Sequence, residues 1–235
     1  MKFITVENYE ELSLKAASII AAEVIKKPSC VLGLATGSSP VGTYKNLIKW
    51  NKEGILDFSM VTTINLDEYV GLDGSSDQSY RYFMNDNLFD HININKASTY
   101  VPNGKAKDMK DECENYDRRI NIMGIDIQLL GIGVDGHIGF NEPDSVFTKE
   151  THTVKLDKST IEANSRFFDS IDDVPKTAVT MGMGGIMSAK KILLVANGKN
   201  KKDILEKAFQ GPIDPKIPAS VLQLHPDVTV IFSEN

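Results

Sequence analysis

The 235-residue chain has few of the residues that build metal centres or disulfides, with two cysteines and four histidines. Cys30 and Cys113 lie far apart and outside any C-x-x-C pair, so neither a disulfide framework nor zinc is predicted. No uninterrupted apolar run approaches the ~20 residues of a membrane span. The first residues also lack the basic-then-apolar pattern of a signal peptide. We therefore expect a cytoplasmic protein without a membrane anchor.

Positive charge is scarce as well, because the formal net charge is -6 and the densest basic cluster is only "GKNKK". Such a cluster is too small for a nucleic-acid surface, so no nucleic-acid partner is expected. An anionic ligand would have to be held by a few local lysines or arginines and by backbone amides.

Short apolar strands alternate with helical patterns along the chain. Helices are expected at about 7–27, 40–50, 79–89, 106–123 and 199–209, and strands at about 30–35, 60–66, 125–131, 190–197 and 227–233. Strands that are apolar on both faces indicate a sheet covered on both sides. The predicted fold is α/β: a doubly wound, mostly parallel sheet with helices on both faces, modified Rossmann-like, in a single domain over 1–235.

In such sheets the ligand crevice lies beyond the carboxyl ends of the strands. Four segments follow predicted strands and are expected to meet there: "ATGSSP" (35–40), "NLDEYVG" (65–71), "GIGVDGHIGFNEP" (131–143) and "ANGKNKK" (196–202).

The first and last of these segments have features of anion sites. In "ATGSSP", Ser39 suits an N-cap and Pro40 the first helical position, so free amides would face the crevice. The segment lacks the lysine of a Walker loop, and an ordinary capped turn explains it too. In "ANGKNKK", Lys199, Lys201 and Lys202 oppose the dipole of the following helix, a conflict that a bound anion would remove. Solvated surface lysines are the alternative.

Acid–base chemistry is suggested by the two middle segments. Asp67 and Glu68 end a strand, and a partly desolvated Asp there could act as a general base, although exposed acids are common in loops. In "GVDGHIGFNEP", Asp135 and Glu142 flank His137 and could fix its tautomer and favour its charged form.

The stretch "GIGVDG" fits the dinucleotide pattern G-x-G-x-x-G, but that pattern needs a helix after its third glycine. The residues that follow, "HIGFNEPDSVF", have no helical periodicity, so the nucleotide interpretation fails. A metal site is weakly supported, because no second histidine has zinc-like spacing.

Arg166, in "ANSRFF", is either a packing residue or a phosphate ligand on a mobile lid at about 156–176.

Together, "LATGSSPVGTYK", "NLDEYVGL", "GIGVDGHIGFNEP", "ANSRFF" and "LQLHPDVTV" resemble the glucosamine-6-phosphate deaminase family over nearly the whole chain. Six-phosphogluconolactonases share the fold, but "HIGFNEP" favours the deaminases. The resemblance implies conversion of glucosamine 6-phosphate and water to fructose 6-phosphate and ammonia, without a metal, flavin or nicotinamide cofactor.

The resemblance also implies residue roles. Asp67 matches the acid that takes the C2 proton, and His137 matches the ring-opening residue, supported by Asp135 and Glu142. The matching phosphate ligands are Ser38, Ser39, Arg166 and Lys201.

Some family members are hexamers activated by N-acetylglucosamine 6-phosphate, and their activator-binding arginine and lysine fall at His152 and Val154 here. Neither side chain carries a permanent positive charge. We therefore expect no such activation and favour a monomer, with a homo-oligomer as the alternative. A sugar-phosphate sensor of the regulator type is a poorer interpretation, because the α/β pattern starts almost at once and no DNA-binding helix pair precedes it.

Overall fold

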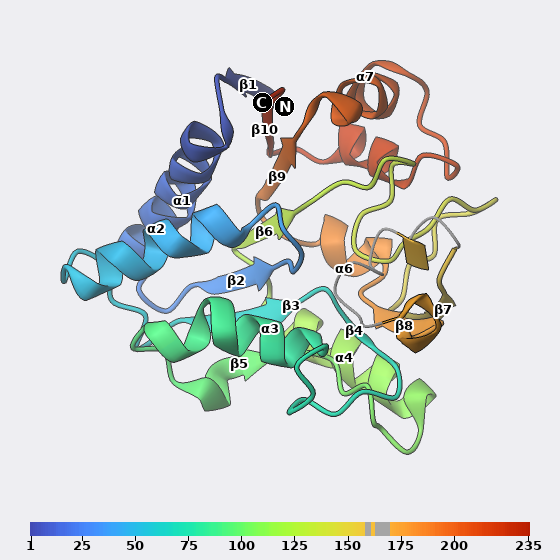
Figure 1. Ribbon diagram of the computed structural model, residues 1–235, viewed down its shortest axis with the longest axis horizontal. Helices are drawn as coiled ribbons and strands as arrows, with labels where there is room; N and C mark the ends of the chain where they lie inside the picture. The colour runs from blue at the N-terminus through green and yellow to red at the C-terminus, as the bar shows by residue number, and fades with distance from the viewer. Residues whose placement is uncertain (158–160, 163–169) are drawn as a thin grey trace.

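The computed structural model describes residues 1–157, 161–162 and 170–235 (Figure 1). Its main sheet has seven strands in the order β1-β10-β9-β6-β2-β3-β5, and all of its pairings are parallel. These strands are β1 (Lys2–Val6), β2 (Val31–Leu34), β3 (Thr62–Asn65), β5 (Thr99–Tyr100), β6 (Ile127–Leu130), β9 (Ile192–Asn197) and β10 (Val228–Ser233).

Helices cover both faces of this sheet, because alternate strand residues point into two separate cores. Leu32 and Leu34 contribute to the core under α1 (Tyr9–Lys26), α2 (Val41–Lys52) and α3 (Tyr80–Asn87). Val31 and Ala35 contribute to the opposite core, under α4 (Met109–Met123), α6 (Met183–Met187), α7 (Lys202–Gln210) and the 3₁₀ segment Pro218–Leu224. The predicted doubly wound α/β fold is therefore confirmed.

A second, antiparallel sheet of three strands lies beside the first, in the order β4 (Asp67–Tyr69), β8 (Thr177–Thr180) and β7 (His152–Lys155). The single strand that was expected to end at Asp67 and Glu68 is two strands, because β3 ends at Asn65 and Asp67–Tyr69 pairs with β8. A small core that includes Tyr69, Phe140 and Ala178 fills this region. The strand that carries Asp67 is thereby packed against the segment 131–143.

Three other local expectations need correction. Ser39 does not cap α2: Pro40 occupies the N-cap position without a side-chain hydrogen bond, and the helix begins at Val41. The helix expected from Lys199 starts with the 3₁₀ turn Lys199–Lys201, after which α7 begins. Strands β1, β5, β7 and β8 and the short helix α6 were not predicted. Three further 3₁₀ turns lie at Phe89–His91, Lys96–Ser98 and Ile171–Asp173.

Both gaps in the described chain fall within the segment 156–176 that is expected to move, so its motion stays a prediction. Among the residues that the structure describes, no helix has the length and apolar character that a membrane crossing requires.

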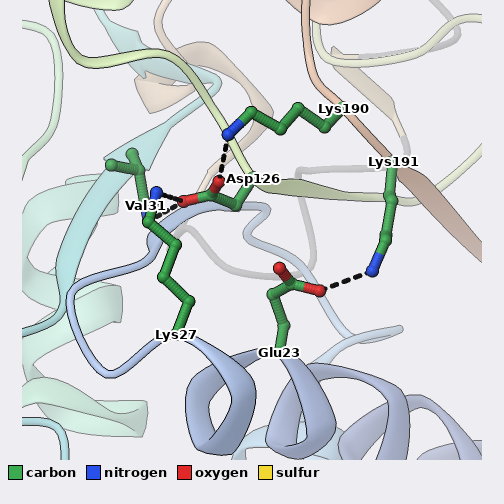
Figure 2. A network of polar contacts seen from close by, with 6 residues as sticks. All are labelled: Glu23, Lys27, Val31, Asp126, Lys190 and Lys191. Atoms are coloured by element: carbon green, nitrogen blue, oxygen red, sulfur yellow. Dashed lines mark hydrogen bonds and ion pairs between the residues drawn. The ribbon is translucent and has the colours of Figure 1, made fainter.

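A charged network joins the amino ends of three central strands (Figure 2). The Asp126 carboxylate, 3 % exposed, accepts hydrogen bonds from Nζ of Lys27 and of Lys190 at 2.7 Å and from the Val31 N–H at 2.8 Å. Beside it, Lys191 Nζ donates to Glu23 of α1 at 2.6 Å. Burial would raise the pKa of Asp126, but the hydrogen bonds from the two lysines overcome this and lower it to about 2.

Replacing Asp126 with asparagine is expected to lower the free energy of unfolding by about 2 kcal/mol, as expected for a hydrogen-bonded buried charge. Because its folded pKa is depressed, the stabilisation is present above about pH 4 and is lost as the pH falls toward 2. Urea unfolding at pH 7 measures the loss. The Lys190→Ala protein should lose much less, since that side chain is 67 % exposed. Equal losses would contradict this assignment.

Candidate active site

The four segments that were expected to line one crevice leave the same edge of the sheet. Strands β9, β6, β2 and β3 are immediate neighbours and parallel, so their carboxyl ends lie side by side (Figure 1). The order of connections reverses between β2 and β6, because the chain runs from β2 to β3 on one side and from β6 to β9 on the other. This is the position at which ligands bind in such sheets. The predicted convergence is confirmed.

The segment after β6 folds back on itself around His137. The Gly133 N–H donates to the His137 carbonyl at 2.9 Å, and the Gly136 N–H donates to the Gly133 carbonyl at 3.2 Å. A Cβ atom on Gly133 would collide with the His137 ring. Gly136 has φ +93°, a conformation that disfavours other residues. No helix begins between β6 and β7, which confirms that this glycine pattern is not a dinucleotide fingerprint.

Two carboxylates meet Nδ1 of His137, as the sequence predicted. This atom lies 2.8 Å from Oδ1 of Asp135 and 3.5 Å from Oε2 of Glu142. The His137 backbone N–H also donates to Oδ1 of Asp135, at 3.1 Å. Burial favours neutral imidazole, but the contact with Asp135 and the charge of Glu142 overcome it and raise the pKa of His137. With Nδ1 held by the acids, Nε2 is the nitrogen left for a ligand.

Asp67 lies at the start of β4, 6 % exposed and directed at the same segment. A Cβ atom on Gly139 would lie 3.4 Å from Oδ2 of Asp67. The carboxylate therefore lies close to the backbone of segment 131–143, which we call the histidine loop. Burial, reinforced by the neighbouring Glu68 charge, raises the pKa of Asp67 to about 8, while His137 acts in the opposite direction. A carboxyl group of that pKa exchanges protons near neutral pH.

The neighbouring Glu68 points away from Asp67 and has a structural task. Its carboxylate accepts the backbone N–H groups of Tyr69, Tyr80 and Arg81, each at 2.9 Å. Two of these donors open α3, where a negative charge is favourable. Strand alternation therefore assigns the two adjacent acids to different environments.

The turn after β2 places Ser38 and Ser39 at the start of α2, where the crevice is expected to hold an anion. From the turn after β9, Lys201 Nζ donates to the carbonyl oxygen of Ile132, just beyond β6, at 2.8 Å. Its positive charge acts on His137 as well, where it opposes the rise in pKa that the two acids cause. The structure thus brings Lys201 to the histidine loop. Arg166 lies outside the described residues.

Several residues around the site were not singled out from the sequence. Phe140 N–H donates to Thr180 Oγ1 at 3.1 Å, and Asn141 Nδ2 donates to the Met181 carbonyl at 2.9 Å, so β8 anchors the histidine loop. The Tyr80 ring stacks on Phe140, with 5.9 Å between centroids, and its hydroxyl bonds to Thr36. No local motif marks these positions, because their partners are distant in sequence.

Asp135, His137 and Glu142 also form a group that could hold a metal ion, since one ligand atom from each lies within 4.8 Å of the others. Three nitrogen and oxygen ligands would suit zinc with one open position. The same geometry also suits a histidine that acts in proton transfer while two carboxylates orient its ring. A hollow of about 330 Å³ adjoins Glu142 and contains His152 and Val154 in its lining.

The raised pKa of Asp67 predicts a pH-dependent rate if this carboxylate acts as a base. Only its charged form accepts a proton, so kcat/KM should rise about tenfold per pH unit up to an apparent pKa near 8. A profile between pH 5.5 and 9 measures this limb, and a flat rate between pH 6 and 8 would contradict it. Because the charge of Glu68 contributes to the raised pKa of Asp67, the rise of kcat/KM in the Glu68→Gln protein should occur at lower pH.

The model of the glucosamine-6-phosphate isomerase/6-phosphogluconolactonase family matches residues 7–231. The glucosamine-6-phosphate deaminase of Lachnoclostridium phytofermentans is 62% identical over 232 residues, covering 98% of both chains. That of Clostridium perfringens is 57% identical over 236 residues, covering 100% of this chain and 98% of the relative.

Solved structures show the same likeness. A monomeric glucosamine-6-phosphate deaminase superposes with a TM-score of 0.97 at 48% identity, covering 99% of this chain and 97% of the other. A 6-phosphogluconolactonase from Thermotoga maritima has a TM-score of 0.77 at 19% identity, covering 100% and 99%, which shows the shared fold alone. The chain belongs to the glucosamine-6-phosphate isomerase/6-phosphogluconolactonase family.

Proposed function

We propose that the chain is a glucosamine-6-phosphate deaminase, which converts glucosamine 6-phosphate and water to fructose 6-phosphate and ammonia. Full-length identity of 57–62% to proteins of that name supports this over lactone hydrolysis, for which the likeness extends only to the fold. The observation that carries the proposal is the pairing of Asp67, buried and of raised pKa, with the Asp135–His137–Glu142 group across Gly139.

Ring opening is assigned to His137. The pyranose form has no acidic hydrogen at C2, whereas the open aldehyde does. Nε2 of His137 is the free ring nitrogen and relays the proton between the O1 hydroxyl and the ring oxygen as the C1–O5 bond breaks. Asp135 and Glu142 hold Nδ1 and stabilise the imidazolium that forms during the relay.

Proton transfer is assigned to Asp67. Its carboxylate removes the C2 proton of the open-chain sugar, which gives an enolamine, and the carboxylic acid returns a proton to C1. The resulting ketimine adds water at C2 and releases ammonia, leaving the ketose. A carboxyl group of pKa about 8 is suited to both directions of this transfer, because neither protonation state is strongly favoured near neutral pH.

Binding of the substrate phosphate is assigned to Ser38, Ser39, Lys201 and Arg166. The first two lie at the amino end of α2, and Lys201 reaches the carboxyl end of β6, the strand beside β2, which supports a shared site for an anion. Arg166, outside the described residues, stays a prediction from the sequence.

The reaction is tested by incubating the purified protein with glucosamine 6-phosphate and measuring ammonia and fructose 6-phosphate. Equimolar formation of both supports the proposal. Hydrolysis of 6-phosphogluconolactone without ammonia release would overturn it in favour of the lactonases. Binding of the sugar phosphate without turnover would favour the sensor interpretation.

A monomer without activation by N-acetylglucosamine 6-phosphate is also proposed. The solved structure with a TM-score of 0.97 is described as monomeric, and His152 and Val154 offer no permanent cation for a phosphate. We expect hyperbolic kinetics that this ligand does not change, and a single species of monomer mass in light scattering. A sigmoidal response that the ligand relieves would contradict the proposal.

A further inference from the structure

The α2 amino end has an unusual cap that comes from another helix. Pro40 at the N-cap has no side chain that can accept a hydrogen bond. The Tyr9 hydroxyl of α1 takes over this task, since it accepts the Gly42 N–H at 2.8 Å. Gly42 is the second residue of α2, which is a position that N-cap oxygens usually satisfy.

The same hydroxyl also fixes the turn in front of the helix. Its single proton is shared between the carbonyl oxygens of Ser38 at 2.9 Å and Ser39 at 3.1 Å. Both carbonyls therefore face Tyr9. A carbonyl oxygen directed at a bound phosphate would repel the phosphate. Because Tyr9 holds the two carbonyl oxygens on its own side, the turn can still bind an anion through its amides.

Peptide geometry then sets the direction of the neighbouring amide. In a planar trans peptide, the carbonyl of Ser38 and the N–H of Ser39 point in opposite directions. Because Tyr9 holds the Ser38 carbonyl oxygen toward α1, the Ser39 N–H points away from α1. This N–H forms no hydrogen bond to another backbone carbonyl within the described part of the chain.

The close approach of the two helices depends on a glycine. A Cβ atom at Gly42 would collide with the Ser13 side chain of α1 and would lie 3.1 Å from Cε1 of Tyr9. Without a side chain at this position, Tyr9 reaches both the helix amide and the two carbonyls.

We propose that Tyr9 is a positioning residue for phosphate binding, because its hydroxyl holds the Ser38–Ser39 turn with the Ser39 amide presented to the phosphate of the sugar. This inference rests on the proposed function of the turn as a phosphate site. Tyr9 does not touch the reacting carbons, so its contribution belongs to binding and not to proton transfer.

The test is the Tyr9→Phe protein, which keeps the ring and removes only the hydroxyl. Pre-organisation of a binding loop predicts a roughly tenfold weaker Kd for inorganic phosphate in calorimetry and a similar rise in KM for glucosamine 6-phosphate. The value of kcat should stay within about twofold. Tyr82→Phe is the matched control, since Tyr82 lies on α3 with 40% exposure and should change neither constant.

The Gly42→Ala protein provides a second variant, in which α1 must withdraw from the turn. It should weaken phosphate binding in the same direction, and the effect should not add to that of Tyr9→Phe. Unchanged Kd and KM in a folded Tyr9→Phe protein would overturn the inference, as would a loss in kcat alone. A wild-type protein that binds phosphate through Tyr9 but releases no ammonia would overturn the proposed reaction and leave this inference standing.

Discussion

Replacing Asp67 with asparagine is expected to lower kcat for glucosamine 6-phosphate by at least about a hundredfold, with KM nearly unchanged. The amide has the same shape but cannot take the C2 proton, and the phosphate contacts assigned to Ser38, Ser39 and Lys201 lie elsewhere in the crevice. Steady-state ammonia release measures the effect. Asp73→Asn is the matched control, because that carboxylate is exposed on the loop after β4 and should leave kcat unchanged.

The same substitution should not harm the fold. Since burial raises the folded pKa of Asp67 to about 8, the folded state holds the proton more tightly than the unfolded chain does. The contribution of this group to stability is therefore largest below about pH 4 and declines as the pH rises through about 8. Removing the charge should raise Tm at pH 8 and change it less at pH 5. An inactive variant with a lowered Tm at both pH values would instead indicate misfolding.

The His137→Gln protein is expected to lose at least about a hundredfold in kcat for a different reason. Its Asp67 is intact, so proton transfer at C2 stays competent while enzymatic ring opening is lost. Ring opening should then limit the rate, and the isotope effect of a substrate carrying deuterium at C2 should shrink toward unity. In the Asp67→Asn protein the C2 step limits, and the isotope effect should persist.

Ammonia release from protonated and deuterated substrate gives both values. His91→Gln is the matched control, since His91 is exposed and lies in the 3₁₀ turn after α3. Full turnover by a folded His137→Gln protein would contradict the ring-opening assignment. An undiminished isotope effect in that protein would assign His137 to the C2 step instead.

The arrangement of the crevice was predictable from the sequence because it depends on local patterns and one topological rule. Apolar strands and the residues that follow them are visible in the chain, and parallel strands place those residues at one edge. The meeting of His137 with Asp135 and Glu142 was predictable for a similar reason, since the glycine-rich segment 131–143 folds back on itself.

Features that depend on distant partners were not predictable. Asp67–Tyr69 forms a strand only because β8, more than a hundred residues later, pairs with it. The prediction that Ser39 caps α2 was wrong, because the Gly42 N–H of α2 donates to the hydroxyl of Tyr9, which belongs to a different helix. The raised pKa of Asp67 depends on its burial and on the charge of Glu68. The sequence shows that the two acids are adjacent, but it does not show how deeply each one is buried.

The proposed reaction and the role of Asp67 in it are tested most directly by ammonia and fructose 6-phosphate formation from glucosamine 6-phosphate, measured for the wild-type and Asp67→Asn proteins side by side. The wild-type protein should form the two products in equal amounts, and Asp67→Asn should form them at least about a hundredfold more slowly while remaining folded. No ammonia from the wild-type protein, or undiminished turnover by the variant, would contradict the account.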